Sequence, residues 1–280
     1  LTPADTALLD PQKILGFTTV LGGKEGHTAI MARSLGLPAV LGIPDLLRFA
    51  RTGQSIIVDG HAGRIILNPT PARVADYTQR QEERERDEKQ LGRLRKLPSV
   101  TRDGQRIGLV ANVELPREAE MAMMAGAEGI GLLRTEFMFM NRDDLPDEDE
   151  QYAALRQIVE TMEGRPVTIR TLDVGGEKLA PSLREHLGEA ANPALGLRAI
   201  RLSLKQRDLL DDQLAAILRA GVHGSVRILL PMISSVSEVK QVREALLQVA
   251  RRLKRRGQKL PDPLPPVGVM IEVPGAALAA

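Results

Sequence analysis

The chain has 280 residues, 43% of them hydrophobic, and its 38 lysines and arginines nearly balance 36 aspartates and glutamates. This length suits one large or two medium domains, and a net charge of +2 argues against a nucleic-acid partner. Because the sequence has no cysteine, disulfides, a cysteine-ligated zinc and a cysteine nucleophile within this chain are excluded. No apolar run is long enough to span a bilayer, and we expect a cytoplasmic protein without membrane insertion.

Residues 1–70 are predicted to form a compact unit that presents one reactive histidine. His27 follows Gly22-Gly23 and precedes a predicted helix over 28–35, which Gly36 closes. The free N–H groups and positive dipole end of a helix start favour a phosphate. A neutral imidazole is also a nucleophile near pH 7. We therefore predict that His27 becomes phosphorylated; the alternative is an ordinary surface histidine.

The rest of this unit is predicted to be β-rich. Residues 38–42 form a short buried strand, and residues 55–60 and 64–69 form two β-branched strands. The link His61-Ala62-Gly63 predicts that the last two strands make a hairpin.

Residues 71–98 differ sharply in composition from what precedes them. Residues 79–89 are almost all charged, and opposite charges recur at i,i+3 and i,i+4 spacing before Pro98 ends the run. We predict a solvated linker helix; the alternative is a surface helix of a single domain.

Residues 99–280 alternate between predicted strands and helices. The strands are 107–112, 129–133, 167–169, 226–230 and 267–271, and the helices are 117–125, 148–162, 206–218 and 236–255. Apolar strands separated by amphipathic helices predict a parallel sheet buried on both faces. The α/β pattern indicates the first five strands of a (β/α)8 TIM-type barrel, with an open doubly wound sheet as the alternative.

Candidate site residues follow the predicted strands. Arg134, Arg170 and Glu272 come at strand ends, and Arg198 lies in the connection after the third strand of this series. Reacting groups of parallel barrels project from the carboxyl ends of strands, and converging arginines suit a phosphorylated carboxylate. Glu272 is an oxygen ligand of the kind that Mg²⁺ prefers. The alternatives are that each arginine pairs with a neighbouring acid, and that Glu272 pairs with one of them.

Other charged groups are assigned structural or surface roles. His61, His186 and His223 have no surrounding motif. The acids of 147–150 are placed in the first turn of a helix, and the basic run 251–256 at a helix C-terminus, where the helix dipole favours each.

Six segments together resemble the phosphoenolpyruvate-utilising enzymes, and within them the phosphoenolpyruvate–protein phosphotransferase (enzyme I) family. They are GGKEGHTAIMARSLGLPAV, AEGIGLLRTEFMFMNRDDLP, VTIRTLDVGGEK, NPALGLRAIR, RILLPMISSVSEV and VGVMIEVP. The resemblance covers nearly the whole chain. It implies a swivelling phosphohistidine β/α domain over 1–70, joined by the linker helix 71–98 to a phosphoenolpyruvate-binding barrel over 99–280.

The resemblance also implies roles for individual residues. His27 would be phosphorylated on Nε2, with Arg33 able to approach the phosphoryl group. Arg134 and Arg170 would clamp the phosphate of phosphoenolpyruvate, and Arg198 would add a further positive charge. Glu272 would be one Mg²⁺ ligand. The phosphoryl group would then pass to a histidine of an HPr-type carrier protein or a paralogue, in the sugar or the nitrogen branch of the phosphotransferase system.

Some features depart from the family pattern. Glu25-Gly26 stands before His27, where the family has a hydroxyl-bearing pair. We expect this chain to be a fragment that lacks the HPr-docking helical domain and the end of the barrel, inactive alone and homodimeric when full length. Two alternatives stay open: an enzyme like pyruvate phosphate dikinase or phosphoenolpyruvate synthase, and a non-catalytic regulatory relative.

Overall fold

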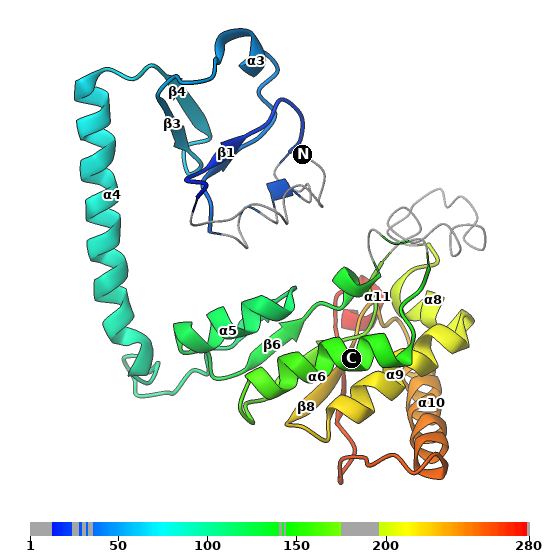
Figure 1. Cartoon of the computed structure of the whole chain (residues 1–280). Coiled ribbons are helices and arrows are strands. Elements are labelled where there is room, and N and C mark those ends of the chain that lie inside the picture. The colour runs from blue at the N-terminus through cyan, green and yellow to red at the C-terminus, as the bar shows by residue number, and fades with distance from the viewer. Residues whose placement is uncertain are drawn as a thin grey trace. The chain divides into compact units, whose positions relative to one another are not determined.

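A computed structural model describes residues 13–23, 28–29, 32, 36–139, 142, 144–174 and 196–278. The chain divides into two compact units, Leu1–Leu94 and Arg95–Ala280 (Figure 1). The expected division into 1–70, 71–98 and 99–280 stays a prediction. Of the predicted helix 28–35, residues 28, 29 and 32 are described and are helical, whereas His27 and Arg33 lie outside the described residues.

The first unit contains two small pairs of strands. Strand β1 (Phe17–Thr18) pairs in parallel with β2 (Ala39–Val40). Strand β3 (Ile56–Asp59) pairs antiparallel with β4 (Arg64–Leu67), which confirms the predicted hairpin. Gly63 in its turn has a φ of 63°, a conformation that glycine adopts without strain. A short helix, α3 (Leu46–Phe49), was not predicted.

The charged segment forms the long helix α4 (Pro71–Gly92), followed by a 3-10 helix over Arg93–Lys96 (Figure 1). The helix is confirmed but ends earlier than the predicted 71–98, and its role as a linker stays a prediction. Thr70 caps its start by accepting a hydrogen bond from the Arg73 amide, and Pro71 occupies the first turn. None of its residues is buried. Its charges pair at i,i+4 spacing, as in Arg80–Asp76 and Arg86–Glu82. The helix therefore depends on local interactions, and one link to the hairpin is the Tyr77 hydroxyl, 3.1 Å from Oδ2 of Asp59.

The second unit is built on one parallel sheet. Its strands are β5 (Ala111–Val113), β6 (Ile130–Leu133), β7 (Val167–Arg170), β8 (Val226–Leu230) and β9 (Val267–Val269), and neighbours in the chain are neighbours in the sheet. A doubly wound sheet reverses its strand order at a switch point. This order does not reverse, so the sheet is that of a TIM-type barrel portion.

Helices alternate with these strands (Figure 1). They are α5 (Pro116–Ala125), α6 (Glu148–Thr161), α8 (Ala199–Lys205), α9 (Arg207–Ala220), α10 (Val236–Arg255) and α11 (Pro274–Leu278). Asp147 caps α6 in a reciprocal pair with Glu150, which confirms the acids of 147–150 as a first helical turn. The basic run 251–256 ends α10 as predicted. Helix α6 packs against α5 and α9, and α10 packs against α9 and α8.

The core lies between the helices and one set of strand residues. Leu133, Ile169 and Ile228 are buried together with Leu155 of α6 and Leu214 of α9. Alternate strand positions are open, since Arg227 in β8 and Gly268 in β9 are exposed. The prediction of a sheet buried on both faces is therefore wrong for these strands. The helices cover one set of side chains, and the other set has no comparable apolar cover among the described residues.

The first strand of this sheet is shorter than predicted. The sequence indicated a strand over 107–112, but β5 begins at Ala111. The Ile107 amide instead donates to the Ser99 carbonyl, next to an isolated bridge between Val100 and Arg106. In the described part of the chain β5 has a partner strand on one side only, so its beginning lacks the second ladder that would extend it.

Candidate functional site

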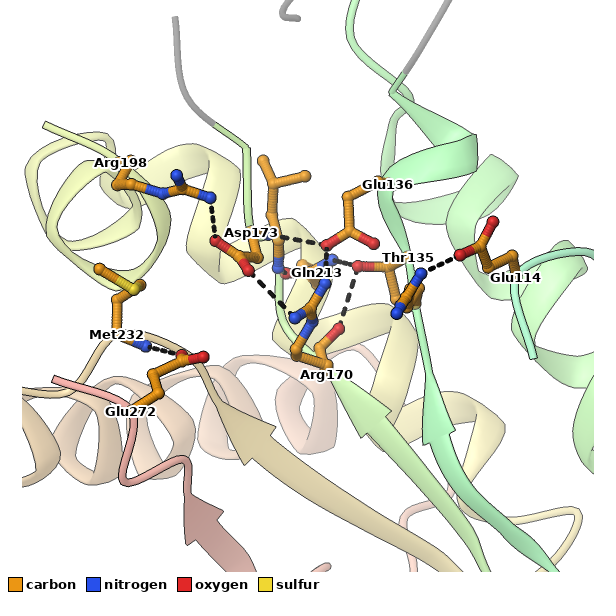
Figure 2. Close-up of polar contacts among 11 residues, drawn as sticks. Glu114, Thr135, Glu136, Arg170, Asp173, Arg198, Gln213, Met232 and Glu272 are labelled. Carbon is orange, nitrogen blue, oxygen red and sulfur yellow. Dashed lines mark hydrogen bonds and ion pairs between the residues drawn. The ribbon is translucent and has the colours of Figure 1, made fainter. Parts of the chain in front are cut away.

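Charged side chains gather at the carboxyl edge of the parallel sheet (Figure 2). Glu114 follows β5, Arg134 follows β6, and Arg170 is the last residue of β7. Glu272 comes three residues after β9. Because the strands are parallel and neighbouring, their ends meet on one side of the sheet, which is where barrel proteins hold reacting groups.

Two arginines share one carboxylate at the centre of this cluster. Asp173 accepts from Nη1 of Arg170 at 3.0 Å and from Nη2 of Arg198 at 2.8 Å. Glu136 accepts from Nη2 of Arg170 and from the Asp173 amide, both at 3.0 Å. The side chains of Arg170 and Asp173 are each 11% exposed, so these ion pairs are shielded from water. The spacing of Arg170 and Arg198 is thus set by Asp173.

Arg134 completes the group of arginines from the neighbouring strand. Its guanidinium forms an ion pair with Glu114 at the end of β5. Its backbone amide donates to the Val113 carbonyl at 2.9 Å, so the residue continues the ladder between β5 and β6. The side chain is 41% exposed and is therefore accessible to a ligand.

The arginines retain unused donors. Within the described part of the chain, the Nε atoms of Arg134, Arg170 and Arg198 are buried and have no hydrogen-bond partner, and neither does Oε2 of Glu136. A buried donor without a partner costs free energy. The same holds for the Nε atoms of Arg207, Arg219 and Arg252 outside the cluster, so these buried donors do not by themselves indicate a ligand.

Burial raises the pKa of Glu136 above its ordinary value, and the positive charge of Arg170 opposes part of that rise. The carboxyl group is thus less acidic than one on the protein surface. A neutral Glu136 would leave Arg170 with Asp173 as its charged partner.

Glu272 is held by backbone instead of by an arginine. Its Oε1 accepts from the Met232 amide at 2.7 Å, and Met232 adopts a φ of 55° at the end of β8 (Figure 2). No ion pair of Glu272 occurs among the described residues, so the alternative of an arginine partner is not supported there. Those residues also contain no group of three or more potential metal ligands. One exposed carboxylate still fits Mg²⁺, because this ion is usually held by one or two carboxylates together with substrate oxygens.

The structure thus brings together Arg134, Arg170 and Arg198, and places Glu272 at the same edge. The structure also confirms the alternative that these arginines pair with neighbouring acids. Arg134 pairs with Glu114, and Arg170 and Arg198 both pair with Asp173. Glu114 was not predicted because the predicted first strand ends at residue 112, whereas β5 ends at Val113. With the observed strand end, Glu114 is the residue that directly follows the strand, as for the other candidates. Thr135, Glu136 and Asp173 lie within the sequence segments quoted above but were given no role. Gln213 carried no signal, since it follows Asp211-Asp212 and looks in the sequence like one more polar residue on the exposed side of a helix.

The predicted histidines have separate outcomes. His223 is structural, because its Nε2 lies 2.9 Å from the Tyr152 hydroxyl and its Nδ1 lies 3.0 Å from Glu160. His61 lies exposed in the hairpin turn. His186, His27 and Arg33 lie outside the described residues.

Fold and site define a TIM-barrel-type α/β protein with an arginine-rich cluster at the carboxyl edge of its sheet. Two family models match the chain: "PEP-utilising enzyme, PEP-binding domain" over residues 88–280 and "PEP-utilising enzyme, mobile domain" over residues 1–63. The chain belongs to the phosphoenolpyruvate-utilising enzymes. No helix among the described residues has the length and apolarity that crossing a membrane requires.

Several curated relatives carry the name phosphoenolpyruvate-protein phosphotransferase. The chain is 44% identical to that of Geobacillus stearothermophilus over 280 residues, covering 100% of this chain and 48% of the relative. The proteins of Cupriavidus necator and Staphylococcus aureus are 46% and 42% identical, with 99% and 100% of this chain and 47% and 48% of the relatives covered. The chain therefore spans about half the length of these relatives. An NMR structure of an Enzyme I protein is 46% identical over 30% of this chain and 34% of that chain, with a TM-score of 0.29 that carries no argument about fold.

Proposed function

We propose that this chain forms part of a phosphotransferase that moves the phosphoryl group of phosphoenolpyruvate to His27. The observation that carries the proposal is the convergence of Arg134, Arg170 and Arg198 at the carboxyl edge of a parallel sheet. Phosphoryl transfer depends mainly on positioning and on charge stabilisation, which bidentate arginines supply. The shared name of the curated relatives supports the same reaction.

The proposed chemistry uses the residues in distinct roles. The arginines bind the phosphate and carboxylate of the substrate and stabilise the charge that spreads over the transferring group. Nε2 of His27 attacks the phosphorus while the bond from phosphorus to the enol oxygen breaks. The leaving enolpyruvate takes a proton at its methylene carbon and becomes pyruvate. The phosphoryl group then passes from His27 to a histidine of an HPr-type carrier, and Arg33 is proposed to approach it.

Mg²⁺ is part of the proposal, with Glu272 as one of its ligands. When bound, the ion neutralises negative charge on the substrate. Oε1 of Glu272 is oriented by the Met232 amide, and the carboxylate has a second oxygen for a ligand.

The organisation of the chain is proposed on the same grounds. Residues 1–70 serve as the phosphohistidine domain, 71–98 as a linker helix and 99–280 as the substrate-binding part. We further propose a cytoplasmic location, where phosphoenolpyruvate is produced, and a homodimer of the full-length protein. The sugar and nitrogen branches both remain compatible with this reaction.

The test is phosphorylation of the full-length protein by phosphoenolpyruvate labelled in its phosphate, with Mg²⁺ present. We expect one acid-labile label, lost in His27→Ala and kept in His61→Ala, the control from an exposed turn of the same unit. Label that persists in His27→Ala would refute the assignment of the nucleophile. Absence of label in the wild type would favour a regulatory relative, for which the unusual Glu25-Gly26 pair is the relevant sequence feature.

A further inference from the structure

A single polar side chain is buried in the middle of an otherwise apolar helix face. Gln213 of α9 is 1% exposed, and the other buried residues of this helix are leucine, alanine and isoleucine. A buried amide is costly unless its groups are hydrogen-bonded. The partners of Gln213 therefore show what its burial achieves.

Both ends of the Gln213 carboxamide bind the strand ends that carry the site (Figure 2). Its Oε1 accepts from the Leu172 amide at 2.9 Å, just beyond β7. Its Nε2 donates to the Thr135 hydroxyl at 3.2 Å, just beyond β6. Thr135, itself fully buried, donates onward to the Arg170 carbonyl at 3.0 Å. These three bonds join β6 and β7 through side chains.

The side chains act where the backbone ladder stops. The pairing of β6 with β7 ends at Leu133 and Ile169. On the other side of β7 the ladder continues one step further, from the Thr171 amide to the Leu229 carbonyl. Thus Gln213 and Thr135 replace the missing backbone partners between β6 and β7, and they hold the two strand ends at a fixed separation.

We propose that Gln213 is a positioning residue that sets the separation of Arg134 and Arg170 for the phosphoryl substrate. Arg134 directly precedes Thr135, and Arg170 supplies the carbonyl that Thr135 binds. The inference rests on the proposed function. It assigns a role to a residue of α9 whose side chain bonds to Leu172 and Thr135 and to none of the charged residues of the cluster. Its physical basis is that small misplacements of binding groups cost large factors in rate.

The first test compares two buried glutamines in the full-length protein. Gln151 is fully buried, and its Nε2 donates to the Pro146 carbonyl at 2.9 Å, outside the cluster. We expect Gln213→Leu to lower kcat/KM for phosphoenolpyruvate roughly 10- to 100-fold. Gln151→Leu is expected to leave it within about twofold, while both variants lower the urea midpoint of unfolding.

The second test uses the isosteric change Gln213→Glu, whose effect depends on protonation. A neutral carboxyl group keeps both bonds, because its O–H donates to Thr135 and its carbonyl oxygen accepts from Leu172. An ionised carboxylate loses the donor, and burial disfavours its charge. We therefore expect the activity of this variant, divided by that of the wild type, to fall as the pH rises. The charged groups of the cluster, Glu136, Arg170 and Asp173, are present in both proteins, so a difference between the two pH profiles originates in the introduced carboxyl group.

The outcomes separate the inference from the proposed function. Gln151→Glu is the control for Gln213→Glu across the pH range. If the wild type turns over phosphoenolpyruvate but the activity of each Gln213 variant matches that of the corresponding Gln151 variant, the positioning role is wrong. If the wild type does not turn over phosphoenolpyruvate, the proposed function and this inference fail together. If Gln213→Leu does not fold, a flat pH ratio for Gln213→Glu overturns the inference by itself.

Discussion

Replacing Arg170 by lysine tests whether the guanidinium fork, and not only its charge, builds the site. Arg170 reaches Glu136 through Nη2 and Asp173 through Nη1. A lysine ammonium is a point charge that cannot hold two carboxylates in this planar geometry. The variant therefore keeps the charge but loses at least one of the two ion pairs, and with it the buried Nε donor.

The magnitude follows from the burial of the contacts. Arg170 and Asp173 are each 11% exposed, and Glu136 is 14% exposed. A hydrogen bond to a charged group contributes about 1.5–3 kcal/mol. Because 1.4 kcal/mol corresponds to a factor of ten, we expect kcat/KM for phosphoenolpyruvate to fall roughly 10- to 150-fold. The unfolding free energy is expected to fall by about the same 1.5–3 kcal/mol.

Arg219→Lys is the matched control. Arg219 is 12% exposed and also joins two carboxylates, Glu148 and Asp149, each at 2.6 Å. It lies on α9 with its partners at the start of α6, and it belongs to no part of the cluster. Both of its contacts use Nη1, and its guanidinium also lies over the Tyr152 ring, 4.1 Å from the ring centroid. We expect Arg219→Lys to lose stability in urea unfolding through this stacking but to keep its kcat/KM. Equal losses of activity in the two variants, or unchanged activity in Arg170→Lys, would refute the reasoning.

Two further predictions concern stability. Burial raises the folded-state pKa of Glu136. We therefore expect the unfolding free energy of the wild type, relative to that of Glu136→Gln, to fall as the pH rises from the ordinary carboxyl pKa through the raised one. Urea titrations across this pH range measure the effect, and a parallel pH dependence in both proteins would contradict it. Gly126 has a φ of 88°, and an added Cβ would lie 2.6 Å from the Arg95 carbonyl oxygen, whereas Gly164 has a φ of 82° and open space around it. We expect thermal melting to show Gly126→Ala destabilised by at least about 1 kcal/mol more than Gly164→Ala; equal effects would show that the close approach is relieved at little cost.

The architecture of the second unit could be predicted because its signals are local and repeated. The strand 226–230 and the helix 236–255 have the predicted bounds, since apolar runs and amphipathic spacing fix them. The first strand was placed wrongly because its extent depends on strand pairing, and among the described residues β5 pairs with β6 alone. Helix α8, whose N-cap is Arg198, was missed because seven residues are too few for a clear periodicity.

The site was predictable in part for a related reason. Arginines after strands are visible in the sequence, because strand ends are visible. Which acid pairs with which arginine depends on how neighbouring strands align, as with Glu114 and Arg134. The role of Gln213 depends on the contact of α9 with two strand ends, and helix periodicity does not encode such a contact.

The strand order has a consequence for how the site arises during synthesis. Because each strand joins the sheet beside its predecessor, the arginine cluster is encoded within one continuous stretch, from Glu114 to Arg198. Glu272 follows Arg198 by 74 positions (272 minus 198), which corresponds to about 4–15 s of translation at roughly 5–20 residues per second. The arginine cluster therefore emerges from the ribosome before the carboxylate proposed to hold a metal, and in that interval Glu136 and Asp173 are the acids that pair with Arg170 and Arg198.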